Sequence, residues 1–262
     1  MHRRVVLKML AALPAAALAA CASAPYTDRP QFILVPRSAE SRMGEDVARD
    51  ILKKEKLSTD PEKTGPVERS GRRIAEVAEA PDFAWQFHTI DKPDTVNAFA
   101  LPGGKVFVYT GLFKLASTEE ELATVIGHEA AHVIARHGAE RMSQAMALDL
   151  GARAALIAAG GAGYSAASMK AFQVAFGVAA NVGVILPFSR QHEYEADRIG
   201  TILMAKAGYD PRKALAFWTK MAEHSKDKQK PPEYLSTHPS DESRIAALKD
   251  LMPEALSYYK RG

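Results

Sequence analysis

The sequence contains only one cysteine, Cys21, among its 262 residues. A disulfide needs two thiols, so none can form within the chain. The cysteine content therefore does not indicate whether the protein resides in an oxidising compartment. No internal repeat is apparent, so nothing indicates a repeat array. The clues to location and function must come from charge, hydrophobic pattern and motifs.

The chain also carries no net charge once residues 1–20 are excluded. The formal charge of the whole chain is +3, and the first 20 residues hold three basic residues and no acid. Without that segment the formal charge is zero. A surface without net charge lacks the overall field that recruits nucleic acid or anionic lipid. We therefore expect no nucleic-acid partner.

The first 20 residues have the pattern of an export signal. Basic residues precede an apolar stretch from Met9 to Ala20, which ends in the small-residue box Leu18-Ala19-Ala20-Cys21. Such a box precedes a lipid-modified cysteine. We predict a lipoprotein signal peptide over residues 1–20, a lipid on Cys21, and a lipidated tether over residues 21–42.

The residues around this signal also bear on the final location. Ala22 and Ser23 follow the cysteine without an intervening Asp. This favours sorting to the outer membrane of a Gram-negative-type envelope, with the chain on its periplasmic face. The pair Arg3-Arg4 is compatible with a twin-arginine signal, so the export route stays open.

Two long stretches lack charge, from Ala154 to Met169 and from Ala171 to Ser189. The second is long enough to span a bilayer. Gln173, Asn181 and Pro187 interrupt it, and its small residues suit tight helix packing instead. We predict two buried helices that cover the functional site, with a membrane span as the alternative.

The motif His128-Glu129-Ala130-Ala131-His132 lies in a stretch that favours helix. Residues 118–147 contain no proline, and Thr118 with Glu121 forms a capping-box pattern at their start. On a helix, the two histidines share one face, where both imidazoles can bind a single zinc ion. Glu129 would sit beside that ion, where it can take a proton from a bound water.

A third ligand has to be found elsewhere in the chain. Metzincins carry a third histidine at the tenth position after the first, but this residue is Gly138 here. His137 would lie about 180° around the same helix from His128. We therefore expect His137 to be a solvated or capping residue.

A carboxylate is the remaining common choice, and three acids occur together at Glu193, Glu195 and Asp197. On a helix, Glu193 and Asp197 share one face while Glu195 points elsewhere. We predict that Glu193 binds the zinc and that Asp197 accepts a hydrogen bond from a ligand histidine. Asp149, the only other acid between Arg141 and His192, is the alternative third ligand.

These residues resemble the CAAX prenyl protease and HtpX-type zinc metallopeptidases, whose pattern is HExxH followed at a distance by ExxxD. Three more stretches resemble the family in the same order: Asn97–Leu112, Arg136–Ser143 and Ser236–Ile245. The short periplasmic members look most similar. The resemblance implies one Zn²⁺ per chain and a zincin-like fold.

The same resemblance implies two further site residues near the C-terminus. His238 and Arg244 would stabilise the oxyanion that develops during peptide hydrolysis, or His238 would occupy the open zinc position in a resting form. Tyr234 and Tyr194 are weaker candidates for hydrogen-bond donors to that oxyanion.

The hydrophobic pattern supports a mainly helical α+β domain over residues 43–262. Residues 98–109 alternate around Pro102-Gly103-Gly104, which predicts a small β-hairpin or sheet beside the metal helix. One of its strands, residues 97–101 or 105–110, would bind extended substrate along an open edge. Further helices are expected over residues 43–55, 67–79, 195–207, 211–220 and 241–251.

We predict from these features a lipid-anchored zinc endopeptidase of the cell envelope. Its expected partners are unfolded or misassembled envelope proteins, among them outer-membrane β-barrels, and the membrane through the lipid on Cys21. One alternative is a non-catalytic chaperone or scaffold with this fold, which would have no need of Glu129. The other is a metallohydrolase that cleaves a different peptide, such as a peptidoglycan stem.

Overall fold

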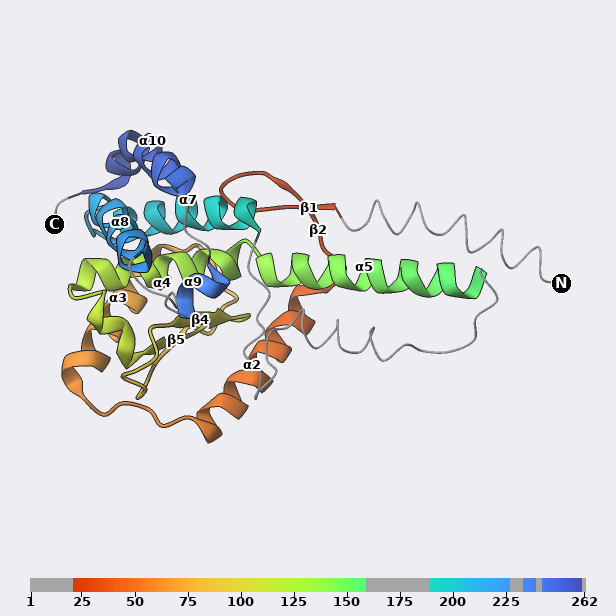
Figure 1. The fold of residues 1–262 in the computed structure, drawn as a ribbon, viewed down its shortest axis with the longest axis horizontal. Coiled ribbons are helices and arrows are strands. Elements are labelled where there is room, and N and C mark those ends of the chain that lie inside the picture. Colours follow the sequence, from red (N-terminus) through yellow and green to blue (C-terminus); the bar gives the residue numbers. More distant parts are fainter. Residues whose placement is uncertain (1–20, 159–188, 227–232, 239–241, 261–262) are drawn as a thin grey trace.

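The computed structural model describes residues 21–158, 189–226, 233–238 and 242–260, and shows a mainly helical α+β fold (Figure 1). The signal peptide expected over residues 1–20 and most of the two uncharged stretches lie outside these residues. Within them, no helix is both long and apolar enough to cross a bilayer.

The small sheet has three strands, β3 (Gln86–Ile90), β4 (Ala98–Leu101) and β5 (Lys105–Tyr109), in the order β3-β5-β4. β4 and β5 form an antiparallel hairpin, and its turn holds Gly103 and Gly104 at φ of 82° and 85°, which only glycine adopts readily. β5 pairs on both sides, so it cannot offer an edge. Of the two expected substrate strands, only β4 lies at an edge.

The metal helix is α4 (Glu119–Ile134), which begins as expected with a capping box between Thr118 and Glu121. Every residue from Leu122 to Ile134 is buried. α4 packs against α3 (Pro61–Val77), α7 (Arg190–Lys206) and α8 (Arg212–Lys226), and it also contacts the sheet strand β4. This helix therefore forms the centre of the core.

The expected single helix over residues 118–147 is wrong. The chain leaves the helix after Ile134, Arg136 adopts a positive φ of 57°, and a second helix, α5, begins at His137 and ends at Ala158. A side chain at φ above zero is rarely found inside a helix, so Arg136 marks the break. In Figure 1, α5 extends away from the body of the fold.

The segment expected to be a tether is folded onto the domain. Residues 21–42 contain β1 (Cys21–Ser23), which pairs antiparallel with β2 (Pro30–Phe32), and the first residues of α2 (Arg37–Lys54). Leu34 N donates to Ser143 Oγ, and Arg136 reaches back to Val35 O and Glu40. This part of the chain thus forms hydrogen bonds to both sides of the break between α4 and α5.

The C-terminal part supplies the remaining helices. The expected helices over 195–207, 211–220 and 241–251 correspond to α7, α8 and α10 (Glu242–Tyr258). A short helix, α9 (Glu233–Thr237), and the 3-10 turn η1 (Thr110–Lys114) were not expected. α7 runs beside α4 so closely that Gly127 and Gly200 meet backbone to backbone.

Candidate metal centre

Four buried side chains converge between α4, α7 and α9. His128 and His132 come from α4, Glu193 comes from the first turn of α7, and His238 follows α9 directly. One ligand atom from each lies within 4.8 Å of the others. The sequence predicted the first three as ligands, and the fold places them together. Asp149 lies in α5.

The spacing within this group suits a small cation. His128 Nε2 lies 3.0 Å from His132 Nε2 and 3.4 Å from Glu193 Oε2, and His132 Nε2 lies 3.4 Å from Glu193 Oε1. Two imidazole nitrogens and a carboxylate oxygen are a common zinc donor set in hydrolases. The residues present therefore fit a zinc ion.

Asp197 stands behind His128. Its Oδ1 lies 3.0 Å from His128 Nδ1, the ring nitrogen that faces away from the ligand group. Both oxygens of Asp197 accept hydrogen bonds of 2.7 Å from Arg244, which is fully buried with it. Burial opposes ionisation, but the facing Arg244 outweighs it and lowers the pKa of Asp197. An ionised Asp197 can hold His128 in one orientation.

Glu193 carries a negative charge in this site. Burial raises the pKa of its carboxyl, but the surrounding His238, His128 and His132 outweigh that effect, and the pKa falls well below its usual value. Arg244 NH1 lies 2.8 Å from Glu193 Oε2. Arg244, which was expected as an oxyanion donor, thus contacts both acids of the site.

Glu129 lies next to the ligands without being part of their group. Its side chain is buried, and Tyr234 donates a 2.8 Å hydrogen bond to its Oε1. The His238 ring stacks on Tyr234 at 4.5 Å, with Nε2 3.5 Å from the same Glu129 oxygen. Sequence reasoning missed the link between Tyr234 and Glu129, although Tyr234 precedes His238 by one helical turn. Tyr194, the other candidate donor, bonds Ser243.

The expectation for one neighbouring residue, His137, changes. His137 is fully buried rather than solvated, with Nδ1 2.9 Å from His132 Nδ1. The expectation placed it on the far side of a continuous helix, and the break at Arg136 removes that premise. Glu195 does face away from the ligands, but it is buried at 4% exposure against His137.

The model of peptidase family M48 matches residues 61–252, which hold the whole ligand group. This chain belongs to peptidase family M48. Members of the family are zinc metalloendopeptidases with a zincin-like domain, and the donor set above agrees with that enzyme class.

Curated relatives extend the likeness to the M48 family beyond the matched residues. The chain is 36% identical over 234 residues, 88% of its length, to "Mitochondrial metalloendopeptidase OMA1" of Schizosaccharomyces pombe. It is 33% identical over 214 residues, 79% of its length, to "Beta-barrel assembly-enhancing protease" of Escherichia coli K12. The aligned regions cover 66% and 42% of these two relatives.

Proposed function

We propose that this M48 chain hydrolyses peptide bonds within proteins, with zinc held by His128, His132 and Glu193. Bound zinc would supply Lewis acidity and lower the pKa of a coordinated water to about 7. The observation that carries the proposal is the convergence of three ligand side chains with Glu129 directly beside them.

Glu129 would act as the general base. Tyr234 holds one carboxylate oxygen by its 2.8 Å hydrogen bond, which fixes the orientation of the group. Glu129 would accept a proton from the attacking water and deliver it to the leaving amine. His238 lies between Glu129 and Glu193, where it would either complete the ligand set in a resting form or donate to the oxyanion.

Arg244 and Asp197 would keep the ligands in place. Arg244 bonds both acids, and Asp197 meets the outer nitrogen of His128. A buried arginine between two carboxylates offsets their repulsion, so both can stay ionised. We therefore propose that Arg244 positions the ligands, in place of the oxyanion role that the family resemblance suggested.

The substitution Glu129→Gln tests the catalytic assignment. The amide cannot accept a proton, so peptide hydrolysis should fall by about 10² to 10⁴-fold, while zinc content stays at one ion per chain. Glu76→Gln, the same change at an exposed helix position, should alter neither. Zinc loss in Glu129→Gln, or activity within a few-fold of wild type, would refute the role of Glu129.

Substrates of this enzyme are proposed to be unfolded or misassembled envelope proteins, including outer-membrane β-barrels. The position of β4 at the edge of the sheet, among the residues that the structure describes, supports this, because an extended segment can bind an edge strand through main-chain hydrogen bonds. The name of the Escherichia coli relative links that protein to β-barrel assembly. Purified protein should cleave an unfolded model substrate but spare its folded form, and a zinc chelator should abolish cleavage.

The proposed location is the periplasmic face of the outer membrane, with a lipid on Cys21. The Leu18-Ala19-Ala20-Cys21 box supports this. Cys21→Ser should abolish lipid labelling and membrane fractionation while sparing hydrolysis by the exported chain. Continued fractionation as an integral membrane protein would show that the stretch Ala171–Ser189 spans the membrane instead.

A further inference from the structure

A second buried polar cluster lies behind the metal centre, on the side of His132 that faces away from the other ligands. Its members come from the start of the chain, from α5 and from α7. Five members are buried, namely Gln31, His137, Glu140, His192 and Glu195, and two are partly exposed, namely Thr27 and Arg29. The catalytic mechanism proposed above uses none of them.

The first link of this cluster is the contact between two histidine rings. His132 Nδ1 lies 2.9 Å from His137 Nδ1. Two ring nitrogens at this distance share one proton, so one donates and the other accepts. If His132 holds zinc through the lone pair of Nε2, as proposed above, its proton would lie on Nδ1. His137 Nδ1 must then be the acceptor.

This requirement fixes the other side of the His137 ring. A neutral imidazole whose Nδ1 accepts a hydrogen bond carries its proton on Nε2. His137 Nε2 lies 2.9 Å from Glu195 Oε2, which can accept that proton's hydrogen bond. Arg29 Nε and Thr27 Oγ1 also donate to Glu195, so the oxygens of this carboxylate act as acceptors for all three neighbours.

Glu195 is in turn oriented by two residues that precede α2, Thr27 and Arg29. Arg29 Nε donates to Glu195 Oε2 at 2.8 Å, and Thr27 Oγ1 donates to Oε1. The other edge of the Arg29 guanidinium forms a two-bond contact with Glu140 at 3.0 and 2.7 Å. Gln31 also donates to Glu140 and to Ala135 O at the end of α4. Each acid is therefore fixed in position by residues 27–31.

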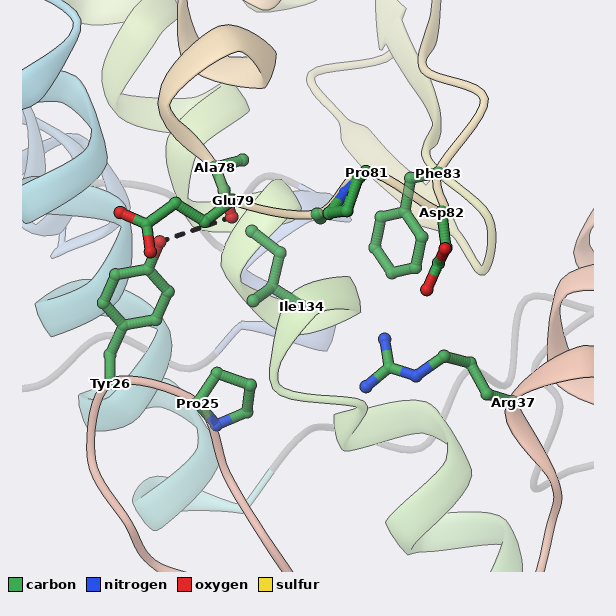
Figure 2. Close-up of a pocket in the computed structure, with 10 residues that line it drawn as sticks. Pro25, Tyr26, Arg37, Ala78, Glu79, Pro81, Asp82, Phe83 and Ile134 are labelled. Atoms are coloured by element: carbon green, nitrogen blue, oxygen red, sulfur yellow. Dashed lines mark hydrogen bonds between the residues drawn. The ribbon is translucent and has the colours of Figure 1, made fainter.

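Two hydrogen bonds fix the conformation and the position of residues 24–31. Ala24 N donates to Arg29 O across the turn, and Tyr26 OH donates to Ala78 O beyond the end of α3. Figure 2 shows Pro25 and Tyr26 on one side of Ile134, the last residue of α4, with Pro81 and Phe83 across a pocket from them. The segment thus packs against the end of the helix that carries His132.

We propose that residues 27–29 position the zinc ligand His132 through a relay from Arg29 and Thr27 to Glu195, then His137, then His132. The relay rests on the proposed function only in that His132 is a ligand. It would set which nitrogen of His132 carries the proton and how the ring is turned. Arg29, Glu195 and His137 are positioning residues that never touch the substrate. Residues 24–31 precede the matched M48 region, which starts at residue 61.

A matched pair of substitutions tests the link to His132. His137→Leu removes the acceptor, and zinc affinity should fall about 10 to 100-fold, as for other residues that orient a ligand. His137→Asn can place its amide oxygen where Nδ1 was, so it should recover most of the affinity. Both variants lose the bond to Glu195, so a merely structural role would make them behave alike. Zinc affinity is measured against a competing chelator, and the unfolding of the zinc-free protein is measured beside it.

A double substitution tests the link to the start of the chain. Arg29→Met should weaken zinc binding, and Arg29→Met combined with His137→Leu should be no weaker than His137→Leu alone, because Arg29 acts through His137. Asp28→Asn, a change at an exposed side chain of the same segment that is outside the relay, should leave zinc affinity unchanged.

Several outcomes would overturn the relay. They are a folded His137→Leu within about threefold of wild-type zinc affinity, equal zinc loss in the two His137 variants, and effects of Arg29 and His137 that multiply. Failure of the proposed function would look different. A wild type that binds zinc without cleaving peptides would refute the protease assignment, while the affinity series would still report on the relay.

Discussion

At the scale of single residues, each ligand histidine of α4 begins a chain of polar contacts that ends in a carboxylate and an arginine. His128 is followed outward by Asp197 and Arg244. His132 is followed by His137, and then by Glu195 and Arg29. An imidazole turns freely about two side-chain bonds, so a fixed partner on the outer nitrogen keeps the inner lone pair aimed at the metal.

The acids of α7 give a graded prediction at this scale. Glu193→Gln should strip zinc or weaken its binding severely, because it removes a charged ligand atom. Asp197→Asn should cost about 10 to 100-fold in zinc affinity, because the amide still contacts His128 but no longer attracts its proton as strongly. Zinc content and hydrolysis are measured for both, with Asp149→Asn as the control expected to be silent.

The order of these effects decides the third ligand. A larger zinc loss from Asp149→Asn than from Glu193→Gln would assign that place to Asp149 and refute the ExxxD assignment. Glu195→Gln should cost less than Asp197→Asn, because its amide oxygen can still accept from both His137 and Arg29.

At the scale of elements, the distance between α4 and α7 sets the geometry of the site. α4 carries two ligands and Glu129, and α7 carries Glu193 and Asp197. The two helices touch at Gly127 and Gly200, where a Cβ on Gly200 would lie 2.8 Å from Gly127 C and from His128 N. Glycine is required here for close approach, since both neighbours are backbone atoms.

Gly200→Ala should therefore push the helices apart. Alanine favours a helix over glycine by about 1 kcal/mol, but overpacking against backbone costs about 1 to 3 kcal/mol, so we expect net destabilisation. Zinc affinity should fall as well, because the contact lies at the ligand His128. Denaturant unfolding and zinc titration check both effects. Gly138→Ala, with no atom within 4 Å, should be neutral or stabilising, and an equally mild Gly200→Ala would contradict the prediction.

The α4–α5 junction is the element that sequence reasoning misjudged. Residues 118–147 lack proline and favour helix throughout, so no local signal marks the turn at Arg136. Arg136 is held there by Val35 O and Glu40, which come from the far start of the chain. A long-range contact thus overrides local propensity and turns His137 from the expected outer face to the metal ligand.

At the scale of the whole molecule, the start of the chain is part of the fold. Residues 21–37 cross the α4–α5 junction and join it to α3 and α7 (Figure 1). Arg29 lies between two buried acids from different helices, Glu140 and Glu195. The ionised state of these acids should therefore stabilise the folded chain.

The pH dependence of stability follows from Glu140. Burial raises the pKa of this carboxyl, but His192 and Arg29 outweigh it and lower the pKa to about 2. A folded pKa below the unfolded value of about 4.3 adds stability above that value, and the gain is lost as pH falls toward 2. Glu140→Gln should therefore lower stability near pH 6, with the deficit shrinking between pH 4.5 and 2. Urea unfolding of the zinc-free protein checks this, and a deficit independent of pH would contradict it.

The sequence by itself determined the metal helix and the chemistry of its ligands. The HExxH spacing, the capping box at Thr118 and the shared face of Glu193 and Asp197 are local, because they depend only on helical periodicity. Tertiary structure decided what surrounds them. Contacts between residues distant in sequence bury His137 against Glu195 and bond Tyr234 to Glu129. The order of the sheet likewise places β5 between two strands. Periodicity states which face a residue takes, but only packing states what covers that face.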